Sequence, residues 1–165
     1  MRNILFILII IASFGANASN WQYSEKKDEL RDTSFYFSGN LSSNINNLGF
    51  PYEENQLRII LRKYLDTQYV LLEMINGQFY CGELTEYENC QFSIKFDNNE
   101  ILSKEYLPQQ GGDNIVFVFV FEPKIFFEQL KNANKAIIEL NAYQGGKVQY
   151  KFDLSGFDIE KSHFQ

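Results

Sequence analysis

Apolar and polar residues alternate along most of this chain, and that pattern is typical of strands that bury one face. The alternation is clearest from Gln91 to Asp97 and from Lys147 to Leu154. Residues 115–121 are apolar at every position, which predicts a central strand covered on both sides. With about eight such segments and no internal repeat or linker, the sequence predicts a mainly β fold, an antiparallel β-sandwich.

Turn and helix signals refine this picture. Asn76-Gly77 lies between two apolar segments and predicts a tight hairpin, because both central residues of such a turn need a positive φ. Pro123 precedes an apolar stripe from Phe126 to Ala133, which predicts one short helix packed on the sheets. A further helical turn is expected at residues 25–31.

The first 18 residues have the three parts of a secretory signal. Arg2 supplies the positive charge, residues 4–12 form an apolar run, and Ala16-Asn17-Ala18 forms a small-x-small cleavage site. The run is shorter than the ~20 residues that a membrane-spanning helix needs, although an uncleaved N-terminal anchor is the alternative. We therefore expect a signal peptide at 1–18 and a single periplasmic or secreted domain at 19–165, without a stable membrane span after cleavage.

The expected export determines how the two cysteines are interpreted. In an oxidising compartment, Cys81 and Cys90 are expected to form a structural disulfide. A redox-active pair would normally be Cys-x-x-Cys, and a zinc site would need two further ligands that the single histidine, His163, cannot supply. We expect neither a metal nor a cofactor.

Such a disulfide would pin an acidic loop between the two cysteines. A pinned loop could dock a basic partner, because its order lowers the entropy cost of association. The alternative is an ordinary solvated loop. The residues of this possible partner-binding loop are Glu83, Glu86, Tyr87 and Glu88.

Two further segments have more than one interpretation. Phe50-Pro51-Tyr52 could be an exposed apolar contact, or it could fold back and cap the core. Asn40-Leu41-Ser42 matches a glycosylation sequon, a short pattern that also arises by chance.

Charge and residue usage argue against several classes of function. With 21 acidic and 15 basic residues the chain has a net charge of −6, which argues against nucleic acid as a partner. His163 lies third from the C-terminus, where fraying is the default, so a catalytic triad is not expected. Asp97-Asn98-Asn99-Glu100 lacks the spacing of a calcium loop and predicts a plain turn. We expect no catalytic residue.

Several short motifs carry a resemblance that covers nearly all of the mature chain. They include Asp-Glu-Leu-Arg-Asp-Thr at 28–33, Phe-Pro-Tyr at 50–52, Gly-Gln-Phe-Tyr-Cys at 77–81, Cys90 and Phe-Asp-Leu-Ser-Gly-Phe at 152–157. The chain resembles a widespread group of small exported proteins of Gram-negative bacteria and mobile elements, most of which have no assigned function. Through the closing segment it is also distantly similar to the invasion-associated locus B proteins, which are secreted β-rich domains. The resemblance implies a periplasmic or secreted β-fold and no known catalytic residues.

Taken together, these features favour a non-catalytic binding module that acts on an envelope or secreted protein. Immunity and inhibitor-type proteins belong to this class. The alternative is a structural component of a surface or secretion apparatus that adds strands edge to edge. A hydrolase of an envelope polymer is a third hypothesis.

Overall fold

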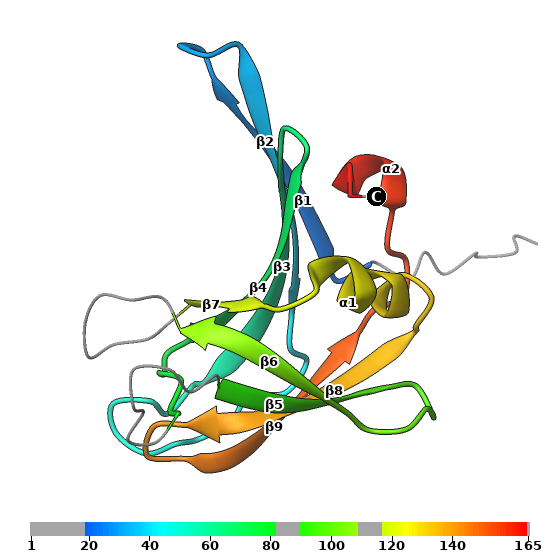
Figure 1. Ribbon diagram of the computed structural model, residues 1–165. Coiled ribbons are helices and arrows are strands. Elements are labelled where there is room, and N and C mark those ends of the chain that lie inside the picture. Colours follow the sequence, from blue (N-terminus) through cyan, green and yellow to red (C-terminus); the bar gives the residue numbers. More distant parts are fainter. Residues whose placement is uncertain (1–18, 82–89, 109–116, 165) are drawn as a thin grey trace, which may run out of the picture.

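The computed structural model describes residues 19–81, 90–108 and 117–164 (Figure 1). Within these ranges one antiparallel sheet holds nine strands in the order β1-β2-β3-β4-β7-β6-β5-β8-β9. The strands are β1 (Trp21–Asp28), β2 (Thr33–Leu41), β3 (Gln56–Tyr64), β4 (Thr67–Ile75), β5 (Cys90–Phe96), β6 (Leu102–Pro108), β7 (Phe117–Val120), β8 (Lys135–Ala142) and β9 (Gly146–Asp153), and the helices are α1 (Pro123–Leu130) and α2 (Ile159–Ser162). The predicted mainly β class is confirmed, and the strands belong to one continuous sheet rather than to two separately paired ones.

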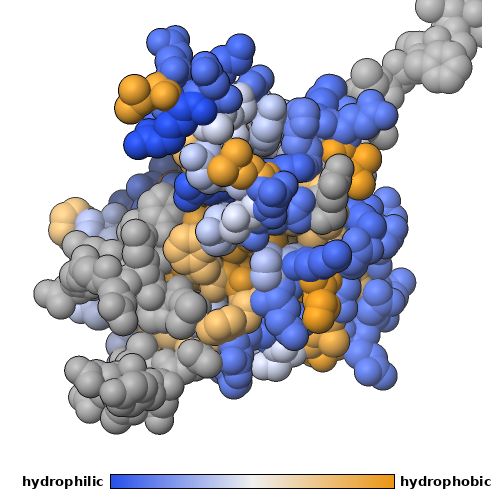
Figure 2. Space-filling view, turned by 45° about the horizontal axis from the view of Figure 1, so that its top comes forward, coloured by the Kyte–Doolittle hydropathy of each residue, from blue (hydrophilic) through white to orange (hydrophobic). Residues whose placement is uncertain are grey.

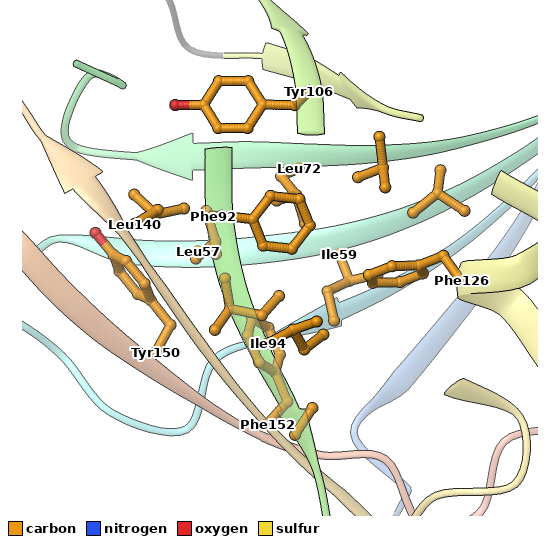
Figure 3. Packing of buried hydrophobic residues seen from close by; sticks show 14 of the residues in the cluster. Leu57, Ile59, Leu72, Phe92, Ile94, Tyr106, Phe126, Leu140, Tyr150 and Phe152 are labelled. Atoms are coloured by element: carbon orange, nitrogen blue, oxygen red, sulfur yellow. The ribbon is translucent and has the colours of Figure 1, made fainter. Parts of the chain in front are cut away.

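The sheet curls around a single core. We call β1, β2, β3, β4 and β7 the first half-sheet, and β5, β6, β8 and β9 the second half-sheet. Figure 3 shows Leu57, Ile59 and Leu72 of the first half-sheet in the same core as Phe92, Ile94 and Phe152 of the second. Two hydrogen bonds draw the ends of the curl together: Asn40 Nδ2 donates to Asp153 O at 2.8 Å, and Ser43 N donates to Lys151 O at 2.7 Å.

The alternating residues point their apolar side chains into this core. In β9, Val148, Tyr150 and Phe152 are buried while the intervening residues are exposed, so one face of the strand supplies the free energy of burial. A hydrogen bond also links the halves inside the core, because the Tyr150 hydroxyl donates to Asn55 Oδ1 at 2.6 Å.

Helix α1 covers the inner side of the curl (Figure 1). It begins at Pro123, as predicted, and buries Phe126, Phe127 and Leu130. The Phe126 ring lies 5.7 Å from the ring of Phe96 in the second half-sheet. The short helix α2 follows near the C-terminus, where the Asp158 side chain caps it by accepting from the backbone N–H groups of the first turn.

The hairpin predicted at Asn76-Gly77 is wrong. Strand β4 pairs with β3 through a turn at Leu65, whose φ is 50°, and Phe79 forms an isolated bridge with Ala142 of β8. Gly77 is instead required by local packing, because a Cβ at this position would collide with the amide of Asn55. The glycine therefore permits close approach of the backbone.

The helical turn expected at residues 25–31 is also wrong. Residues 21–28 form β1, which pairs with β2 along its whole length, and the turn begins only at Asp28. There the Asp28 carboxylate accepts from the backbone N–H groups of Leu30 and Arg31. The hairpin of β1 and β2 projects beyond the body (Figure 1), and Figure 2 shows mostly hydrophilic surface with scattered apolar patches. Leu30, in the turn of this hairpin, is 85% exposed.

The strand predicted at 115–121 is central, since β7 lies between β4 and β6. Val118 and Val120 point into the core and are buried. The expected cover on the other side is not found for the described residues, because Phe119 remains partly exposed on the outer face. This exposed side of β7 is part of a larger surface.

Candidate functional site: an aromatic face outside the sheet

Part of the outer surface of the first half-sheet, over β2, β3, β4 and β7, is apolar, although it faces away from the core. Strand residues alternate between faces, so neighbours of buried core residues stand side by side on the outside. Both described helices lie on the inner side of the sheet and leave this surface open. We call it the outer aromatic face; its residues are Phe35, Phe37, Ile60, Arg62, Tyr64, Tyr69, Leu71 and Phe119.

Strand register brings these side chains into one connected series. Phe35 lies opposite Tyr64, and their rings stack at 4.1 Å with an interplanar angle of 8°. Phe37 continues the row, with its ring centroid 6.5 Å from that of Phe35. At the other end, the ring of Tyr69 meets that of Phe119 edge to face at 5.7 Å. Such cross-strand pairs stabilise a sheet, and here they also fix the shape of its surface.

Arg62 joins the two aromatic groups. Its guanidinium carbon lies 5.4 Å from the ring centroid of Phe35 and 5.7 Å from that of Tyr69. These are cation–π distances, and the rings hold the guanidinium in place. The Nε atom is buried and has no hydrogen-bond partner in the described part of the chain.

A shallow depression of about 320 Å³ adjoins this face and extends to β1. Gly39 lies in its floor, where the lack of a side chain leaves space between Phe37, Arg58 and Ile60. A Cβ at Gly39 would meet Arg58 Cδ at an ordinary 3.6 Å. The space is therefore not required by the packing of the sheet.

The outer surface of the second half-sheet is different. Its strands present a polar and charged set of side chains: Gln91, Ser93, Lys95, Lys135, Glu139, Asn141, Lys147, Gln149, Lys151 and Asp153. The main apolar exception is Ile137, which is 37% exposed. This is the usual outside of a one-sided sheet, so the aromatic face is not a general property of the fold.

The disulfide predicted from the sequence is present. Cys81 and Cys90 are joined, with their Cα atoms 5.5 Å apart, and Cys81 Sγ lies 3.3 Å from the hydroxyl of Tyr106. The acidic loop predicted as a partner contact, with Glu83, Glu86, Tyr87 and Glu88, lies outside the described residues, as does the segment 1–18.

The other candidate residues from the sequence differ in burial and in their contacts. Phe50 is 85% exposed and does not cap the core, while Tyr52 is tied down by a hydrogen bond that Gln78 Nε2 donates to its hydroxyl. Asn40 is fully buried, so the sequon at 40–42 cannot carry a glycan in this fold. Asp97 lies in a turn, where its carboxylate accepts from backbone N–H groups.

His163 ends α2, and its ring stacks on Tyr36 at 3.8 Å. Across the described ranges no three His, Cys, Asp or Glu side chains gather as a metal site. Burial raises the pKa of the Tyr106 and Tyr150 phenols, and both groups belong to the core rather than to a cleft. No helix among residues 19–81, 90–108 and 117–164 is both long and apolar enough to cross a membrane.

The outer aromatic face was not predicted as a site, but the sequence contained a signal for it. Three of its four strands are shown by single residues to depart from strict alternation: Ile60 interrupts β3, Leu71 lies within an apolar run of β4, and Phe119 belongs to the all-apolar segment of β7. In an antiparallel sheet with an open outer surface, apolar residues on both faces indicate a second buried or binding surface.

Searches with this chain against models of protein families, against curated proteins and against solved structures found no match.

Proposed function

We propose that this protein is a non-catalytic binding module that contacts another protein through its outer aromatic face. The observation that carries the proposal is the connected series of aromatic, aliphatic and arginine side chains on the open side of the first half-sheet. Contiguous exposed apolar surface marks interaction sites in proteins. Aromatic residues and arginine are also the types enriched at the centres of protein interfaces.

The construction of the face supports binding with a low entropic cost. Its side chains stand on hydrogen-bonded strands and pack against one another, as the stacked pair of Phe35 and Tyr64 illustrates. Little rotamer freedom is left to lose on association, and preorganisation of this kind raises affinity. A solvent-exposed loop would have to be ordered first.

We propose that the partner is an envelope or secreted protein, and that the module acts as an immunity or inhibitor-type protein. The signal-like residues 1–18 support export, and the disulfide between Cys81 and Cys90 suits an oxidising compartment. Binding without chemistry is sufficient for this mode of action.

Affinity capture from envelope and secreted fractions tests the proposal. The bait is compared with the double variant Phe37→Ser/Tyr69→Ser and with the control Ile137→Ser, which changes an exposed apolar residue on the other half-sheet. We expect a saturable partner that the control retains and the double variant loses. A partner that the double variant still binds, or the absence of any saturable partner, would contradict the proposal.

A second candidate, strand addition in an assembly, is favoured by one of the two edges of the sheet, that of β1. The β9 edge is covered, because Asn44 bonds both to Lys151 N and to Gln149 O. Within the described residues β1 pairs only with β2, so its other edge can accept a strand. Size-exclusion chromatography and electron microscopy should then show ordered assemblies, and a strict monomer at high concentration would exclude this candidate.

A further inference from the structure

We infer that the segment recognised by the outer aromatic face is acidic, and that Arg62 binds one of its carboxylates. This inference rests on the proposed function and names the chemistry of its partner. It follows from the environment of Arg62, from the orientation of the aromatic rings, and from the distribution of charge over the strands.

Arg62 is held in place without a carboxylate partner among the described residues. The other arginine in β3, Arg58, pairs with Glu73 at 2.7 Å, whereas no ion pair within the described ranges involves Arg62. Its guanidinium carries five N–H donors in a planar fork, and no described residue accepts a hydrogen bond from its buried Nε. A guanidinium positioned between the Phe35 and Tyr69 rings is suited to a bidentate carboxylate.

The rings present their edges to the partner. Phe35 and Tyr64 come from adjacent strands and stack almost parallel, so their planes stand upright on the sheet. Arg62 lies over the Phe35 ring as well, which leaves little of that ring's faces open for stacking on a sugar or a nucleobase. The edge of an aromatic ring is its positive part, so the exposed edges and the guanidinium favour the same negative charge.

The charge of the strands is the reverse of the charge of the chain. The whole protein has a net charge of −6. Yet the charged residues at the outward positions of β2, β3 and β4 are Arg58, Arg62 and Glu73, and because Arg58 pairs with Glu73, Arg62 leaves a net positive charge on this surface. A basic and apolar surface on an acidic protein complements an acidic segment with apolar side chains, and it repels basic ones.

A peptide selection tests this chemistry while the partner is unidentified. Random twelve-residue peptides displayed on phage are selected on the disulfide-bonded protein, and those whose binding is lost in Phe37→Ser are sequenced. We expect these face-dependent peptides to be enriched in Asp and Glu. Their affinity should fall at least tenfold in Arg62→Gln and less in Arg62→Lys, which keeps the charge but not the fork. The control Lys151→Gln, a cation on the other half-sheet, should change affinity less than twofold.

The outcomes separate the two proposals. Face-dependent peptides that are neutral or basic, or that bind Arg62→Gln as well as the unaltered protein, would overturn the inference and leave the proposed function standing. The absence of any face-dependent peptide would count against the proposed function itself. Self-association that Phe37→Ser abolishes would assign the face to a second copy of the chain and overturn the inference. Thermal melting of each variant establishes that it is folded.

Discussion

The two half-sheets have the same interior and opposite exteriors. Both send alternate apolar residues into one core, where Ile59 of β3 and Ile94 of β5 are completely buried. Outside, the second half-sheet carries lysines, acids and amides, whereas the first carries a connected aromatic series with Arg62 in its middle. The fold requires only the interior, because the second half-sheet forms with a polar outside.

This difference distinguishes the residues that stabilise the fold from the residues that the protein presents to a partner. An apolar side chain on the outside gains less from burial than one in the core, and it exposes the protein to unwanted association. A series of them in register on four neighbouring strands therefore needs a reason beyond folding, and recognition of a partner supplies it. Substitutions at matched positions on the two surfaces can break or confirm this distinction.

The largest effect is expected on binding. Phe37→Ser removes a ring at the end of the aromatic series and should weaken the partner that is captured by the protein about 100-fold, as truncation of an interface anchor can. The matched change Ile137→Ser, on the polar outside, should alter affinity less than twofold. Isothermal titration of both variants measures the difference, and equal losses would remove the distinction between the two surfaces.

The free energy of unfolding should also respond differently to substitutions on the two outer surfaces, but the effect should be smaller than the effect on binding. Leu71 is only 8% exposed although it points outward, because Ile60 and Phe119 flank it in the register. Leu71→Ser should lower the free energy of unfolding by about 2 kcal/mol. Ile137→Ser should cost at most about 0.5 kcal/mol, as expected for a surface change. Urea unfolding tests this, and a cost for Ile137→Ser as large as that for Leu71→Ser would show that both outsides are packed alike.

The shared interior predicts a dependence on alkaline pH. Burial raises the pKa of the Tyr150 phenol, whose hydroxyl donates a hydrogen bond to Asn55, the residue directly before β3 of the other half-sheet. Its contribution to stability is fully present below the ordinary tyrosine pKa of about 10 and is lost as the pH rises through the higher folded value. Tyr150→Phe should cost about 1–2 kcal/mol at neutral pH, because Asn55 loses a donor.

The same variant should also lose less stability above pH 10 than the unaltered protein does. Denaturant titrations at pH 7 and at pH values above 10 check both parts. A neutral-pH stability that Tyr150→Phe leaves unchanged would indicate that the bond between the half-sheets contributes nothing.

The smallest effect is expected for a substitution in the depression beside the outer aromatic face. Gly39→Val should fill it with a side chain that suits a strand, and it should raise the free energy of unfolding by about 0.5 kcal/mol. The neighbouring Arg58 leaves the first added carbon at 3.6 Å. If the depression receives part of the partner, the more stable variant should bind less tightly, which thermal melting and titration together establish. A variant with both higher stability and unchanged affinity would exclude the depression from the contact.

The interior could be predicted from the sequence because burial of one strand face produces a local pattern. Alternation in residues 91–97 and 147–154 predicts strands that the structure contains, and Pro123 with its apolar stripe predicts α1. The pairing of strands is less local. Gly77 looks like part of a turn, yet its role is to make room for Asn55, which is distant in sequence.

The candidate site was harder to predict for the same reason. Phe35, Arg62 and Tyr69 meet only through the register of β2, β3 and β4, which no short motif encodes. Their sequence signal is an imperfection, a loss of strict alternation, which also fits a strand buried on both sides. The acidic loop between Cys81 and Cys90 carries a more obvious pattern and remains a prediction.

The central claim is that the protein meets its partner with the outside of the first half-sheet and not with that of the second. Site-specific photo-crosslinking tests it most directly, with benzoylphenylalanine placed at Tyr69 or at Ile137, two outward positions of similar exposure at 36% and 37%. In the cells that make the protein, irradiation should give a discrete adduct from position 69 and none from position 137. The same adduct from position 137 alone, or equal adducts from both, would contradict the claim.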